Sequence, residues 1–94
     1  MTINTVNICG IPYRVTEHQP IFDANTKHFG QVDFLGAEIR INHNMAEVIK
    51  TETLVHEIVH AILVHIGRAE LSEDEVLVQS LANAINQTFE VKED

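Results

Sequence analysis

The hydrophobic pattern of this chain changes its period once, near Asn44, and this change limits the folds that it can adopt. Before Asn44, Ile39 and Ile41 alternate with polar residues, which is the two-residue period of a strand with one buried face. After it, apolar residues recur at the three- and four-residue spacing of an amphipathic helix. These residues are Val48, Val55, Ile58, Val59, Ile62, Leu63 and Ile66. Because strands come first and helices second, the sequence predicts an α+β domain.

The N-terminal half is expected to form a small antiparallel sheet. Ile8 to Val15 has the composition of a first strand or a short hairpin, and Thr16 to Gly30 is polar and loop-like. Two short strands, Gln31 to Leu35 and Ala37 to Asn42, follow on either side of a tight turn. The charged residues that alternate along the second of these strands favour a position at the edge of the sheet.

The C-terminal half is expected to form two helices that pack as an antiparallel pair. The first helix begins with Asn44 as its N-cap, or at Thr51, and ends before Gly67, a residue that commonly terminates helices. The second begins at Ser72, where Ser72 and Glu75 have the spacing of a capping box. Only a short segment separates the two helices, and short connections join antiparallel neighbours.

Composition narrows the possible partners and the compartment. Ninety-four residues predict one domain, residues 1–94, and the net charge of −8 argues against direct binding to nucleic acid. No apolar run approaches the about 20 residues that span a bilayer, and the N-terminal residues do not resemble a secretory signal. The lone Cys9 excludes an internal disulfide and is interpreted as a small buried hydrophobe. We therefore expect a cytoplasmic protein that does not bind membranes; the oligomeric state is not predicted.

The most informative motif of the chain is His56-Glu57-Ile58-Val59-His60, which lies inside the first predicted helix. His56 and His60 are four residues apart, so their rings lie on one helix face and can bind one tetrahedral Zn²⁺ ion. Glu57 follows His56 by about 100° of helix rotation, so it borders the metal and suits a general base. The alternative interpretation is that both histidines are structural residues of the helix.

A catalytic zinc site needs a third protein ligand, and the start of the second helix is the best source. Glu75 is the first choice because it shares the inward side of that helix, with Asp74 and Glu73 as alternatives. His65 lies five residues after His60, on a different side of an unbroken helix, and is interpreted as a surface residue or a residue behind the site.

The motif and its flanking residues resemble a known group of enzymes. Thr53 to Ile62, preceded by Ala37 to Asn42, is similar to the core of small HExxH zincins, in particular the ImmA/IrrE-type peptidases of phages and prophages and the SprT-like group. The resemblance extends from about Gly30 to Phe89 in the order of elements, but only the HExxH signature is specific. It implies a minimal zincin core, a zinc ion held by two histidines and a downstream acid, and a setting in phages or mobile elements.

The sequence therefore predicts a zinc-dependent metallopeptidase that cleaves a protein or peptide substrate, with Glu57 as general base. Gly36 to Asn42 is interpreted either as the edge to which a substrate strand adds or as an ordinary edge strand blunted by Glu38 and Arg40. The residues that can stabilise the oxyanion of the tetrahedral intermediate are Tyr13, His43, His65 and Arg68, and the sequence does not choose among them. The alternative prediction is a non-catalytic protein-interaction module that zinc stabilises.

Overall fold

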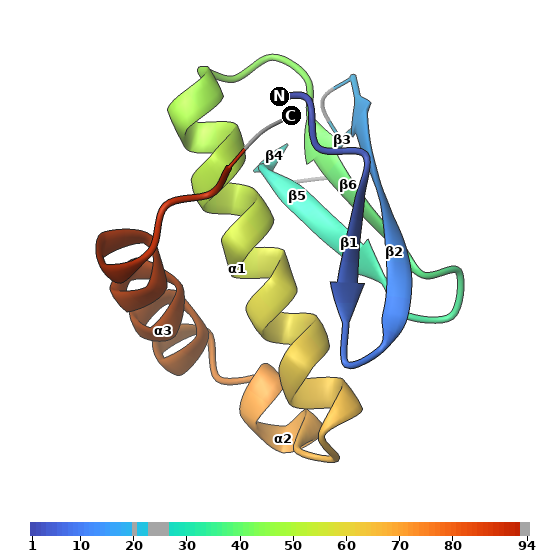
Figure 1. The fold of residues 1–94 in the computed structure, drawn as a ribbon, viewed down its shortest axis with the longest axis vertical. Helices are drawn as coiled ribbons and strands as arrows, with labels where there is room; N and C mark the ends of the chain where they lie inside the picture. The colour runs from blue at the N-terminus through green and yellow to red at the C-terminus, as the bar shows by residue number, and fades with distance from the viewer. Residues whose placement is uncertain (20, 23–26, 93–94) are drawn as a thin grey trace.

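A four-stranded sheet forms first along the chain and the helices follow it, which confirms the predicted α+β class (Figure 1). The computed structural model describes residues 1–19, 21–22 and 27–92. The strands of the main sheet are β1 (Thr5–Ile8), β2 (Ile11–His18), β5 (Gly30–Asp33) and β6 (Glu38–Asn42). The short strands β3 (Ile21–Phe22) and β4 (Lys27–His28) pair with each other. The helices are α1 (Glu47–His65), α2 (Ala69–Ser72) and α3 (Glu75–Thr88).

The first two strands form a hairpin, one of the two alternatives that the sequence left open. Its turn consists of Cys9 and Gly10, whose φ angles are 52° and 84°. Two consecutive residues with positive φ are typical of the type I′ turns that connect twisted strands. Cys9 is exposed in this turn, so its interpretation as a buried hydrophobe is wrong.

The strand that was predicted at the edge, β6, lies inside the sheet, whose order is β1-β2-β6-β5. It pairs with β5 in antiparallel and with β2 in parallel orientation, so the sheet is mixed and not purely antiparallel as expected. The polar residues of β6 were misleading because they have partners within the protein. The buried Glu38 carboxylate accepts hydrogen bonds from Arg40 Nε at 2.9 Å and Thr16 Oγ1 at 3.0 Å. The edge strands of the described sheet are β1 and β5.

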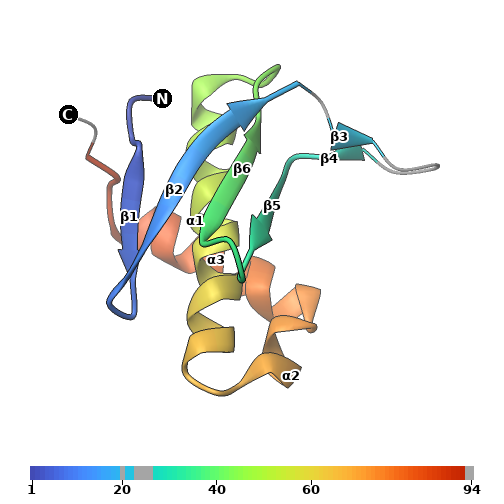
Figure 2. The same ribbon diagram turned by 90° about the vertical axis from the view of Figure 1, so that its right-hand side faces the viewer.

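Helix α1 lies between the sheet and α3, and it contributes to a core on each side (Figures 1 and 2). Toward the sheet, Leu54 and Ala61 pack with residues of β1, β2 and β6. Toward α3, which returns alongside α1 as predicted, the packed residues are Val55, Val59, Leu63, Val78 and Ala82. Helical spacing thus divides the apolar residues of α1 between two partners.

The ends of α1 agree with the predictions at one terminus only. Its N-cap is Ala46, without a side-chain cap, so the predicted cap Asn44 lies outside the helix. The N–H of Asn44 donates to Asn42 Oδ1 at 2.9 Å. At the other end Gly67 has a φ of 84°, and the N–H groups of Gly67 and Arg68 donate to carbonyls of the last turn, as in a Schellman motif. None of the helices within the described residues has the length and apolar character needed to cross a membrane.

The Glu38 contacts predict a pH dependence of stability. Hydrogen bonds from Arg40 and Thr16 hold the pKa of Glu38 below its ordinary value of 4.5. The pKa of Glu38 is lower in the folded than in the unfolded state. The stabilisation is therefore complete above the unfolded-state pKa and is lost as the pH falls through the folded-state pKa. We expect the free energy of unfolding of Glu38→Gln to change less than that of the parent between pH 5 and the acid limit of folding.

Urea denaturation at a series of pH values measures this effect. The Glu73→Gln variant, which also removes one negative charge but from an exposed position, is the control. Parallel pH profiles for the parent and Glu38→Gln would contradict the role of this carboxylate.

Candidate metal centre

Between its two packed sides, α1 has a third side that faces a cavity of about 670 Å³. Strand β5 forms one wall of the cavity, α1 the floor, and Ser72 and the start of α3 the opposite wall. Strand β5 approaches α1 closely at Gly30, where an added Cβ would lie 2.8 Å from Thr53 Cγ2. This close approach is why glycine occupies the position, and it brings the edge strand next to the histidines of α1.

His56 and His60 both line the cavity, one helical turn apart as predicted. Their ring centroids are 5.0 Å apart and the rings meet edge to face. The side chains are 23% and 12% exposed, so both rings are largely shielded but reach the cavity. Two rings that face the same cavity are the arrangement that a shared ion requires.

Ser72 contacts His60 instead of capping a helix. His60 Nδ1 lies 2.9 Å from Ser72 Oγ, and Ser72 Oγ donates to the carbonyl oxygen of His60 over 3.4 Å. The predicted capping box is therefore wrong: α3 begins at Glu75, and its N-cap is Asp74, whose side chain accepts from Leu77 N at 3.0 Å. The tertiary contact places Ser72 at the end of α2, where it is buried beside α1.

Glu75, the first choice for the third ligand, reaches across the cavity to both histidines. Its Oε2 lies 3.4 Å from His56 Nε2, and its Oε1 lies 3.2 Å from His60 Nε2. Since it takes no part in a capping box, its carboxylate is available to the cavity. The alternatives Asp74 and Glu73 do not line the cavity, because Asp74 caps α3 and Glu73 ends α2.

The contacts of His60 determine which of its nitrogens can bind an ion. Because the Ser72 hydroxyl donates its hydrogen to the backbone, its oxygen accepts the hydrogen of Nδ1, and the neutral ring has its lone pair on Nε2. Burial lowers the pKa of His60, and the neighbouring His56 lowers it further, although Glu75 and Ser72 act in the opposite direction. The neutral ring thus points a lone pair at the Glu75 carboxylate. Two acceptors at this separation repel each other unless a proton or a cation lies between them.

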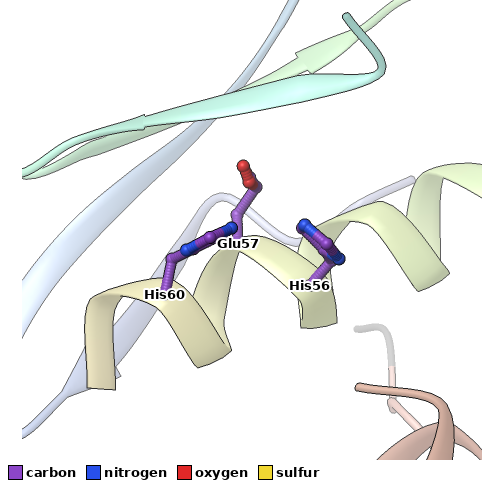
Figure 3. Close-up of side chains that lie close together, drawn as sticks. All are labelled: His56, Glu57 and His60. Carbon is purple, nitrogen blue, oxygen red and sulfur yellow. The ribbon is translucent and has the colours of Figure 1, made fainter. Parts of the chain in front are cut away.

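Glu57 lies beside these groups on the side of the sheet. Figure 3 shows its carboxylate extending from α1 toward the strands, with the two imidazole rings lying along the helix below it. One ligand atom each from His56, Glu57 and His60 lie within 4.8 Å of one another. The Glu57 side chain is buried and lines the cavity. Its carboxylate is thus close enough to act on a group held by the histidines.

The distances from Glu75 to the two histidines are compatible with a tetrahedral zinc site. Bonds of about 2.0–2.1 Å at tetrahedral angles place neighbouring ligand atoms about 3.3 Å apart. The two distances from the Glu75 oxygens to the histidine nitrogens, 3.4 and 3.2 Å, are close to this value. Two imidazoles and one carboxylate also form a donor set that zinc commonly binds. The residues present therefore fit a zinc ion with three protein ligands and an open fourth position.

The four candidates for stabilising an oxyanion lie away from this cavity. The Tyr13 hydroxyl is buried in the core and hydrogen-bonds His65 Nε2, so both belong to the packing of α1 against the sheet. His43 pairs with Glu17, and the exposed Arg68 pairs with Glu70. None of these four candidates lines the cavity, so the structure does not bring any of them to the candidate site.

Comparisons of this chain with models of protein families, with curated proteins and with solved structures find no match.

The Ser72 contact predicts an effect on metal affinity. We expect Ser72→Ala to weaken Zn²⁺ binding by about 10–100-fold, because the His60 ring loses the acceptor that fixes its orientation and its tautomer. Ser72→Thr keeps the hydroxyl and should retain most of the affinity. Competition with a chromophoric chelator measures the affinity, and equal values for the alanine and threonine variants would contradict this role of the hydroxyl.

Proposed function

We propose that this protein is a zinc-dependent metallopeptidase in which His56, His60 and Glu75 hold the ion and Glu57 is the general base. The observation that carries the proposal is that the Glu75 carboxylate lies 3.4 Å from His56 Nε2 and 3.2 Å from His60 Nε2, with the Glu57 carboxylate beside the same two rings. We assign Glu75 as the ligand, and not Glu57, because the oxygens of Glu75 lie against the Nε2 atoms of both rings. Glu57 faces the sheet, where a substrate would lie.

The chemistry follows from the roles of these side chains. A zinc ion held there supplies a Lewis acid that polarises the scissile carbonyl and lowers the pKa of a water molecule. Glu57 accepts a proton from the attacking water and delivers it to the nitrogen of the leaving amine. His56 and His60 would position the ion beside the Glu57 carboxylate, and Ser72 keeps His60 in the tautomer that this requires.

The edge strand β5 offers a place for the substrate backbone. The sequence had suggested Gly36 to Asn42 for this role. That segment contains β6, which pairs with β2 on one side and β5 on the other and so has no free edge in the described sheet. Within the described sheet, β5 pairs with β6 alone, and Gly30, Gln31 and Val32 line the cavity. An extended peptide that adds to β5 would run past the histidines, which is the arrangement needed for cleavage of its backbone.

The assignment of the third ligand can be tested with two matched variants. Glu75→Gln and Glu73→Gln each remove one carboxylate from the same short stretch of chain, but only Glu75 faces the histidines. We expect purified parent protein and Glu73→Gln to bind one zinc ion per chain by elemental analysis, and Glu75→Gln to bind it at least tenfold more weakly. Equal affinities for all three proteins would exclude Glu75 as a ligand.

The enzyme assignment depends on Glu57. We expect Glu57→Gln to retain its zinc ion while its rate of peptide hydrolysis falls by about 10²–10⁴-fold, since the general base is lost. Turnover is measured on denatured proteins and on a peptide library, with zinc content determined on the same samples. Zinc binding without turnover in the parent protein would support the alternative, a zinc-stabilised interaction module.

A further inference from the structure

The cavity of the candidate metal centre has an apolar wall that the proposed chemistry does not use. Phe29, Val32, Phe34 and Ile49 line it together with the histidines. Phe29, Phe34 and Ile49 are among the exposed large hydrophobic residues of the chain. They come from β5, its flanking segments and the first turn of α1, yet they meet at one cavity. Apolar side chains gathered in a concave surface favour an apolar group of a ligand.

Glu52 supplies a charge beside this wall. It precedes His56 by one helical turn, so it lies on the same side of α1 and lines the same cavity. Its carboxylate is exposed and is assigned neither to the ion nor to proton transfer. Within the described residues Glu52 forms no ion pair. The lysine and arginine side chains that form ion pairs there contact other carboxylates.

Glu52 also borders a second hollow of about 320 Å³, which Glu47 and Glu90 line together with the exposed Phe89. No lysine or arginine belongs to the described lining of either hollow. Glu47 pairs with Lys50 and with the N-terminal ammonium, whereas Glu52 and Glu90 form no ion pair within the described residues. These two carboxylates give the surface around them a local negative potential, which attracts cationic groups.

We propose that the cavity selects peptide segments in which an apolar or aromatic side chain is followed or preceded closely by lysine or arginine. The apolar side chain packs against Phe34 and Ile49, and the basic side chain pairs with Glu52. This inference rests on the proposed function, since it names the substrate class of the same site. It gives Glu52 the role of a specificity-determining residue that leaves the chemical step unaffected.

Matched peptides test the charge preference. Three peptides of one sequence carry an aromatic residue and, near it, lysine, norleucine or glutamate. We expect kcat/KM of the zinc-loaded protein to fall in this order, with about a tenfold difference between lysine and glutamate. Glu52→Gln should bring the three values within about twofold of one another, and Glu52→Lys should reverse their order. Glu73→Gln, an exposed acid outside the cavity, should keep the preference of the parent.

Two matched alanine variants test the role of the apolar wall. Phe34 lines the cavity, whereas the adjacent Leu35 is fully exposed in the turn and does not. We expect Phe34→Ala to reduce the preference for aromatic over alanine peptides at least fivefold and Leu35→Ala to leave it unchanged. Equal effects of the two variants would overturn the apolar part of the inference.

A binding measurement separates this inference from the proposed function. Fluorescence anisotropy of the same labelled peptides with zinc-loaded Glu57→Gln reports recognition without cleavage. If the parent hydrolyses all three charge variants equally and they bind equally, the substrate class is wrong while the peptidase assignment stands. If no peptide is hydrolysed but the lysine peptide binds best and loses this preference in Glu52→Gln, the recognition stands and the peptidase assignment fails.

Discussion

The hydrogen bond between His60 and Ser72 is the interaction on which the rest of the site depends. It fixes the His60 ring so that its Nε2 lone pair points into the cavity, and it holds the end of α2 against α1. Because α2 is held there, the next residues can turn and start α3 with Glu75 opposite the two histidines. One contact thus sets both the protonation pattern of a candidate ligand and the path of the chain that supplies another.

Helix α1 organises the molecule because its residues serve three sides at once. Leu54 faces the sheet, Val59 faces α3, and the residues between these two sides face the cavity. At about 3.6 residues per turn, His56 and His60 fall on that third side, and Glu57 falls at its border with the sheet. A shift of one position in the motif would direct the rings into a core.

The fold class and most of the site follow from local patterns, whereas the missed features depend on long-range contacts. Helical spacing predicted the arrangement of His56 and His60, and the return of the second helix indicated Glu75. The role of Ser72 was missed because Ser-x-x-Glu is also a capping box, and only the tertiary contact with His60 decides between the two. The central position of β6 was missed because Glu38, charged and thus expected at an edge, finds its partners in neighbouring strands.

The candidate ligands come from two helices, α1 and α3, so a bound ion would hold α3 against α1. Only Val78 and Ala82 of α3 are buried, so this helix has a narrow apolar contact with the remainder of the chain. An ion bound by α1 and Glu75 would close the intervening segment into a loop and restrict the unfolded chain, as a covalent crosslink does. Metal supply would then govern how often α3 detaches, and through it how readily cellular proteases degrade the chain.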